Sequence, residues 1–196
     1  TGRVYVFEGS ASGLASAPST TLTGPHSTSY YGQALASGGD VNGDGYDDVI
    51  VGAYGEDAAY LVYGSSTALS SSYDVSTVAG ATITPDSAQY YFGYEVSAAG
   101  DFNDDGYADF LVADYGSYSY TSSIYLFTGS ASGLVGSISA DLSSHLQIDS
   151  DDSGDYFGYT GAVASGDFNG DGYSDIGFGE YGNDDNGSTY GMGYVY

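Results

Sequence analysis

The sequence predicts an all-β protein of tandem four-stranded antiparallel blades of the propeller type, in about three repeats. Two series of motifs recur along the 196 residues at a spacing of roughly sixty residues, which indicates repeated structural units. Short apolar and aromatic runs are interrupted by Gly and Ser, and no window keeps a helical periodicity. Four short strands per repeat of this length are typical of a propeller blade.

The first series of repeats is an eight-residue motif. Phe7 to Leu14 reads FEGSASGL, and Phe127 to Leu134 reads FTGSASGL, with a degenerate copy at Tyr63 to Ser66. The second series is an Asp-rich segment that begins at Asp40, Asp101 and Asp167. Both series define the same period, so each repeat contains one copy of each motif.

Four strands, A to D, are expected in each repeat. Strand A leads into the Asp-rich segment and strand B leaves it, strand C is aromatic and aliphatic, and strand D is a weaker pattern. The expected ranges are 31–39, 92–100 and 157–166 for A; 48–52, 109–112 and 175–178 for B; 4–7, 60–63, 124–127 and 193–196 for C; and 21–23, 81–84 and 146–148 for D.

These strands divide the chain into a partial blade (1–29, strands C and D), two complete repeats (30–90 and 91–155) and a third repeat without strand D (156–196), all in one structural unit. Closed propellers have 4–8 blades. We therefore expect an open or partial propeller that is completed by head-to-tail assembly or belongs to a longer array. Unpaired strands at its edges are templates for other chains, and contacts of that sort produce rings or filaments.

The charge is strongly negative, with 26 acidic residues against one basic residue and a formal net charge of -25. This excludes nucleic acid and anionic membrane surfaces as partners, because both are polyanions. No stretch is long and apolar enough to insert into a bilayer. Cations, neutral glycans and surface proteins are left as partners, and an extracellular or cell-surface location is expected.

The Asp-rich segments follow one pattern, Asp-x-Asn-x-Asp-Gly-Tyr-x-Asp. Side-chain oxygens at positions one, three, five and nine, with the main-chain carbonyl of position seven, make an all-oxygen ligand set of the kind that Ca²⁺ prefers. Gly at position six permits the turn that gathers them. The sequence therefore predicts three Ca²⁺ sites, formed by Asp40, Asn42, Asp44, Tyr46 and Asp48; by Asp101, Asn103, Asp105, Tyr107 and Asp109; and by Asp167, Asn169, Asp171, Tyr173 and Asp175.

An EF-hand and a metal-free turn are the two alternatives to this interpretation. An EF-hand requires Glu at position twelve, where this chain has Val51, Val112 and Phe178. A polar turn without metal suits any single copy, but its recurrence at three matching positions argues against it. Mg²⁺ stays open as the ion, although it favours strict octahedra with retained waters.

The motifs around the Asp-rich segments resemble FG-GAP repeats, the blades of integrin α-subunit propellers and of many bacterial surface proteins. Phe92-Gly93 and Phe157-Gly158 match the FG element, and Tyr31-Gly32 is a variant of it. The GAP element corresponds to Gly52-Ala53-Tyr54, Ala113-Asp114-Tyr115 and Gly179-Glu180-Tyr181, with Tyr in place of Pro. The resemblance implies a propeller-type fold, Ca²⁺ in the loops, and adhesion or recognition as the role.

Two classes of function follow from these observations. The first is a calcium-stabilised structural or adhesion protein, and the alternative is a lectin-like propeller that binds carbohydrate. No enzyme is expected, because no nucleophile, base and acid share a motif. The acidic pairs Glu56-Asp57 and Asp184-Asp185 are interpreted as solvated loop charge. Asn186 begins an N-glycosylation sequon.

Overall fold

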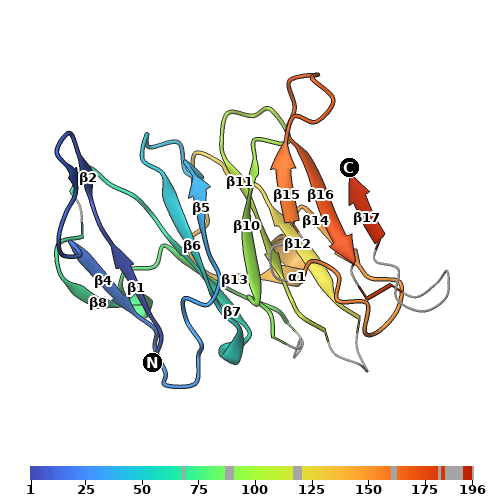
Figure 1. Ribbon diagram of the computed structural model, residues 1–196, viewed down its shortest axis with the longest axis horizontal. Helices are drawn as coiled ribbons and strands as arrows, with labels where there is room; N and C mark the ends of the chain where they lie inside the picture. The colour runs from blue at the N-terminus through green and yellow to red at the C-terminus, as the bar shows by residue number, and fades with distance from the viewer. Residues whose placement is uncertain are drawn as a thin grey trace.

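The computed structural model describes residues 1–67, 69–86, 91–116, 121–159, 163–180 and 182–183, and the main chain of 192–195. Four small sheets stand side by side like the leaves of a fan, with the N-terminal sheet at one side and the C-terminal sheet at the other (Figure 1). The predicted blade-type, all-β architecture is confirmed.

The sheets are built from consecutive stretches of the chain, with two exceptions, β8 and β13, that are described below. The first contains β1 (Arg3–Val6), β4 (Thr20–Thr23) and β8 (Ser72–Asp74); the second β5 (Leu35–Gly39), β6 (Asp48–Ala53), β7 (Ala58–Val62), β9 (Ala81–Thr84) and β13 (Gly136–Ser139); the third β10 (Glu95–Gly100), β11 (Asp109–Ala113), β12 (Ser123–Phe127) and β14 (Leu146–Asp149); and the fourth β15 (Val163–Gly166), β16 (Asp175–Glu180) and β17 (Met192–Val195). A two-stranded hairpin, β2 (Gly9–Ser10) and β3 (Gly13–Leu14), and three short helical turns, η1 (Tyr54–Glu56), η2 (Val75–Thr77) and α1 (Ala140–Ser143), complete the described elements.

The second and third sheets have the predicted strand order A, B, C, D, and these strands pair antiparallel. The A strands begin later than predicted, because left-handed residues bend the chain before them. Tyr30 and Gly32 have φ of 52° and 86°, and Tyr91 and Gly93 have φ of 67° and 82°. Each glycine of this FG element then donates its N–H to strand B of its own sheet, as Gly93 does to the carbonyl of Ala113 at 3.1 Å.

The predicted four strands per repeat omit a fifth strand that the structure adds from the following repeat. β8 pairs in parallel with β4, and β13 pairs in parallel with β9. Both lie in the connection between strands C and D, where each carries a single large apolar residue, Tyr73 or Ile138. Every repeat junction of this kind is therefore stabilised by main-chain hydrogen bonds as well as by side-chain packing.

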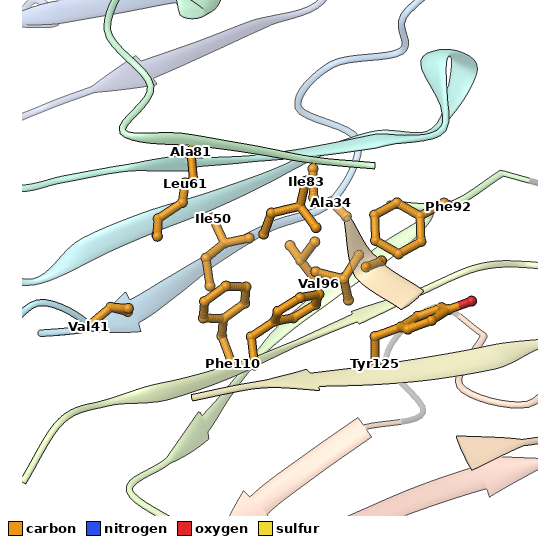
Figure 2. Packing of buried hydrophobic residues seen from close by; sticks show 14 residues of the cluster. Ala34, Val41, Ile50, Leu61, Ala81, Ile83, Phe92, Val96, Phe110 and Tyr125 are labelled. Carbon is orange, nitrogen blue, oxygen red and sulfur yellow. The ribbon is translucent and has the colours of Figure 1, made fainter. Parts of the chain in front are cut away.

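Apolar side chains fill the spaces between adjacent sheets. Between the second and third sheets, Ile50 and Leu61 face Phe110, while Ile83 lies near Phe92 and Val96 (Figure 2). All but Val96 have 2% or less of their surface exposed. Burying such side chains contributes roughly 1.5–3 kcal/mol each, so neighbouring sheets hold each other in place.

Candidate metal-binding loops and a row of tyrosines

The three Asp-rich segments are the loops that join strand A to strand B. They follow β5, β10 and β15, and each is closed by a strand pair: Gly39 with Asp48, Gly100 with Asp109, and Gly166 with Asp175. The structure thus places the fifteen residues of the predicted sites at equivalent positions, with position nine as the first residue of β6, β11 and β16.

Side-chain oxygens hold each loop in shape by accepting main-chain hydrogen bonds. In the first loop, Asp40 accepts from Asp44 N–H at 2.9 Å and from Gly45 N–H at 2.7 Å, and Asp44 accepts from Tyr46 N–H at 3.0 Å. Asn42 accepts from Asp44 N–H at 3.0 Å. The second and third loops repeat all four bonds at equivalent positions. The loops are thus preorganised by their own side chains.

Position nine is the buried anchor of the first two loops. Asp48 accepts from the N–H groups of Val41 and Gly64, both at 2.8 Å, and its side chain is fully buried. Burial raises the pKa of Asp48, the two N–H groups oppose this, and the nearby charges of Asp44 and Asp40 raise it further. The carboxylate of Asp48 is therefore repelled by those of Asp40 and Asp44, and a bound cation would offset this repulsion.

The second and third loops differ at position nine. Asp109 is also fully buried and accepts from Phe102 N–H at 3.0 Å and Gly129 N–H at 2.9 Å, and burial is the main reason that its pKa rises to about 6. Asp175 is only half-buried and accepts from Phe168 N–H at 2.7 Å. The third loop is therefore the least enclosed of the three.

Position six of each loop has the left-handed backbone conformation that its glycine was expected to allow, and position four has it as well. The position-six glycines Gly45, Gly106 and Gly172 have φ of 90°, 87° and 99°. Position four is left-handed too, and there the second loop has Asp104, with φ of 56°, in place of glycine. Side chains rarely adopt this conformation, so Asp104 carries local strain.

The donor chemistry fits a hard cation, whereas the side chains are turned toward the backbone. In the part of the chain that the structure describes, no group of three or more His, Cys, Asp or Glu side chains is placed to hold a metal. Each loop nevertheless offers carboxylate and amide oxygens with no nitrogen or sulfur donor among the predicted ligands. Calcium ligation in the loops, including the carbonyls of Tyr46, Tyr107 and Tyr173, stays a prediction. Asn186 lies outside the described residues.

At the opposite end of the A–B hairpins, tyrosines form a continuous row that the sequence-based prediction missed. The row joins the FG and GAP elements of three repeats: Tyr30, Tyr54, Tyr91, Tyr94, Tyr115, Tyr156 and Tyr159. Tyr30 stacks on Tyr54 with ring centroids 4.7 Å apart, and Tyr94 stacks on both Tyr115 and Tyr159, at 5.0 and 5.3 Å. The regular spacing of Tyr beside each FG and GAP element was the signal that could have revealed it.

The acidic pair Glu56-Asp57 is not the solvated loop charge that the sequence predicts. Asp57 is half-buried and accepts the N–H groups of Tyr91 at 2.8 Å and Phe92 at 3.2 Å, so it fastens one repeat to the FG element of the next. Glu56 accepts a hydrogen bond from the Tyr60 hydroxyl at 3.3 Å. Main-chain donors of the neighbouring repeat, which the sequence does not reveal, account for the difference. Asp184-Asp185 lies outside the described residues.

Blades with an Asp-rich loop between the FG and GAP elements define a repeat protein of the FG-GAP class. The family model of the FG-GAP repeat matches residues 31–70 and 92–127, so the chain contains FG-GAP repeats and the predicted resemblance is confirmed. Curated relatives are integrin α subunits. Integrin alpha-PS2 of Drosophila melanogaster is 31% identical over 180 residues, 83% of this chain and 12% of the relative. Integrin alpha-IIb of Mus musculus is 34% identical over 121 residues, 59% of this chain and 11% of the relative.

The chain thus spans about a tenth of the length of the relatives that it matches. These similarities support an adhesion-type repeat domain. The described residues contain no helix with the length and apolar character needed to cross a membrane.

Proposed function

We propose that this chain is an extracellular adhesion-type repeat domain whose blades are stabilised by calcium. The observation that carries the proposal is the threefold recurrence of one loop geometry, with the same acceptors, the same left-handed positions and a buried Asp at position nine in two loops. The integrin α relatives and the large excess of acidic residues support the adhesive role and the extracellular location.

In this proposal, the Asp and Asn side chains at positions one, three, five and nine, with the position-seven carbonyl, hold the ion in each loop. Bound calcium would supply the positive charge that offsets the mutual repulsion of the carboxylates. The first loop also contacts the next repeat, because Ala108 N–H donates to the carbonyl of Asp40 at 3.0 Å and Ser130 N–H donates to that of Val41 at 2.9 Å. An ion that fixes the first loop would therefore also support the junction with the following repeat.

Thermal unfolding with and without calcium tests the proposal. Ion binding to the folded state alone stabilises it by about 2.7 kcal/mol at a hundredfold excess over Kd, so excess EDTA should lower the Tm by several degrees. Asp44→Asn should weaken the response to calcium, whereas Asp47→Asn, an exposed neighbour outside the ligand set, should leave it intact. The same melt in Mg²⁺ distinguishes the ions, and an unchanged Tm in EDTA would refute calcium stabilisation.

The assembly of repeats into a longer array is the second part of the proposal, and it keeps the division into units 1–29, 30–90, 91–155 and 156–196. Among the described residues, β1 pairs only with β4, and β17 pairs only with β16, so both sheets have a free edge. Such edges favour association with further repeats or with other copies of the chain. Light scattering over a range of concentrations measures this association, and a 20.1 kDa species at all concentrations would contradict self-assembly.

Carbohydrate binding is the second candidate function, and the tyrosine row favours it. Tyr30 and Tyr91 have 57% and 44% of their surface exposed, and aromatic rings with hydroxyl groups suit neutral sugars. Many ring faces in the row are covered by neighbouring tyrosines, which is why this candidate is placed second. A glycan array with the wild-type chain and Tyr30→Ala distinguishes the two: a selective signal that the substitution removes would favour the lectin function.

A further inference from the structure

The parallel edge strands of the first and second sheets, β8 and β13, belong to one recurrent device, which we call the clasp. A clasp is a short parallel strand followed by a capped helical turn, namely residues 72–77 and residues 136–143. In both clasps the strand pairs with strand D of the preceding repeat in the same register, since Tyr73 lies opposite Leu22 and Ile138 lies opposite Ile83.

The two clasps match beyond their strands. Asp74 caps η2 by accepting from Ser76 N–H at 2.9 Å, and Ser139 caps α1 by accepting from Leu142 N–H at 3.2 Å. The residue after each cap, Val75 or Ala140, has none of its surface exposed. Each clasp therefore adds a strand at the edge of the preceding sheet and a buried apolar side chain at the junction between repeats.

Strand D of the third sheet, β14, has no clasp among the described residues, and its burial differs accordingly. Leu146 is 46% exposed, whereas its equivalents Thr20 and Ala81 are 4% and 1% exposed. Ile148 is only half-buried, whereas Leu22 and Ile83 are buried. The outer edge and the apolar residues of β14 are thus open where the two preceding D strands are covered.

An apolar pocket of about 30 Å³ lies beside this edge. Its lining side chains are all apolar and come from the third and fourth sheets; Leu126, Leu146, Ile148 and Ile176 are among them. At the preceding junction, between the second and third sheets, Leu134 and Ile138 of the clasp region pack against the core. The pocket therefore marks the place where the corresponding apolar side chains of a clasp would lie.

We propose that the edge of β14 is a docking site for the clasp of a further FG-GAP repeat, which adds as a parallel strand with an apolar residue opposite Ile148. The partner chemistry is a strand with one central apolar residue, followed by a Ser or Asp cap and a small apolar residue, because both clasps in this chain have that pattern. Main-chain pairing and one apolar contact determine recognition, as in other strand-addition complexes. The inference rests on the proposed array and names one of its contacts, and it does not depend on calcium.

The charge distribution allows this partner. The chain carries a net charge of -25 and would repel a strongly acidic segment, but residues 134–143 contain only one acidic residue. A synthetic peptide of that sequence, LVGSISADLS, is therefore a direct probe. Among the described residues, β14 pairs only with β12, so its outer edge has no strand partner.

The test measures binding of the labelled 134–143 peptide to the intact chain by fluorescence anisotropy. We expect saturable binding that weakens at least tenfold when the peptide carries Ile138→Asp. Register is checked by disulfide trapping, which is clean because the chain has no cysteine. Ser137 of the clasp lies opposite Thr82, whose equivalent in β14 is Gln147, so a Ser137→Cys peptide should trap on Gln147→Cys chain and not on Ser12→Cys chain.

Several outcomes would overturn the proposal. They are absence of binding, binding that survives Ile138→Asp, and equal trapping at positions 12 and 147. Trapping between two full-length chains, one with Gln147→Cys and one with Ser137→Cys, would instead support the proposal and identify the docked clasp as that of a second copy. Failure of the peptide to bind leaves the array proposal to be judged by light scattering, so the two hypotheses fail separately.

Discussion

Tyr63 and Leu134 are joined by two hydrogen bonds, although 71 residues separate them. The Tyr63 hydroxyl donates to the carbonyl of Leu134 at 2.9 Å and accepts from the N–H of the same residue at 2.7 Å. The pair connects the end of strand C in one repeat with the residues that lead into the clasp of the next. A single side chain thus satisfies both polar groups of a main-chain segment that has no strand partner at that point.

Tyr63→Phe should therefore lower the free energy of unfolding by about 1–2 kcal/mol, because the half-buried main-chain groups of Leu134 lose their partner. Denaturant unfolding measures the change. Tyr5→Phe is the matched control, since Tyr5 is 52% exposed, and it should change the stability little. Equal effects at both positions would contradict a specific role for the Tyr63–Leu134 bonds.

Asp114 gives the protein a pH dependence of defined sign. The side chain is 1% exposed; Oδ1 accepts from Ser123 N–H at 2.9 Å, and Oδ2 accepts no hydrogen bond from the residues that the structure describes. Burial raises the pKa of Asp114 to about 7, so the folded state holds a proton that the unfolded state releases near pH 4. This contribution to stability is fully present below pH 4 and is lost as the pH rises to about 7.

Asp114→Asn should consequently flatten the dependence of unfolding free energy on pH between 4 and 7. The comparison is made with the exposed Asp151→Asn, which should keep the wild-type slope. Urea titrations at several pH values provide the measurement. A slope that is the same in Asp114→Asn and in the wild type would show that other groups dominate this range.

Asp104→Gly should stabilise the chain by about 0.5–1 kcal/mol, because glycine adopts the φ of 56° without the strain that a side chain causes there. This relief of strain outweighs the conformational entropy that glycine loses on folding. Asp104→Ala removes the same charge and keeps a Cβ, so it should not stabilise. Thermal melts of the two variants separate backbone strain from charge repulsion. Stabilisation by alanine equal to that by glycine would assign the effect to charge.

Asp109 and Asp175 occupy the same position of two loops and should differ in their contribution to stability. In the presence of EDTA, Asp109→Asn should cost about 2–3 kcal/mol, because the N–H groups of Gly129 and Phe102, one buried and one partly buried, lose a charged acceptor and one of them faces an amide donor. Asp175→Asn should cost about 1 kcal/mol, because its site is half-buried. Equal losses would contradict the assignment of Asp109 as the more deeply buried anchor.

The tyrosine row should be visible in the near-ultraviolet circular dichroism spectrum, because the chain has no Trp to dominate it. Tyr94 lies at the centre of the row, stacked on Tyr115 and Tyr159, and its hydroxyl donates to that of Tyr159 at 3.2 Å. Tyr94→Leu should reduce the Tyr signal by more than one residue's share, whereas Tyr5→Leu should not. Similar spectra for the two variants would indicate that the rings of the row do not couple.

The sequence predicts the B, C and D strands well, because the pattern of their own apolar side chains determines that they form strands. Strand B is a nearly continuous apolar run, and 48–52 and 109–112 recur in β6 and β11 with their ends shifted by at most one residue. The clasp strands could not be predicted in this way. Ser72–Asp74 and Gly136–Ser139 have little strand character of their own, and their conformation depends on pairing with a D strand more than fifty residues away in sequence.

The oxygen side chains of the candidate site could be predicted from the sequence, whereas the backbone conformations and contacts between repeats could not. The pattern of Asp, Asn and Gly located all three loops, since the side chains that are predicted to bind calcium are also those that shape the turn. The left-handed position four escaped notice because Asp104 is not a glycine. Asp57 escaped notice because its partners are main-chain N–H groups of the next repeat, which no side-chain pattern reveals.

The clasp sets the order in which the sheets of this chain can be completed during synthesis. β9 ends at Thr84, but its parallel partner β13 begins only at Gly136, so a sheet emerging from the ribosome stays incomplete until most of the next repeat has been synthesised. Loss of a following repeat exposes the sheet before it, whereas loss of a preceding repeat leaves the later D strand covered. Truncation at the C-terminal side therefore leaves a D strand without its parallel partner, whereas truncation at the N-terminal side does not. During synthesis, the sheet made last has the same open edge.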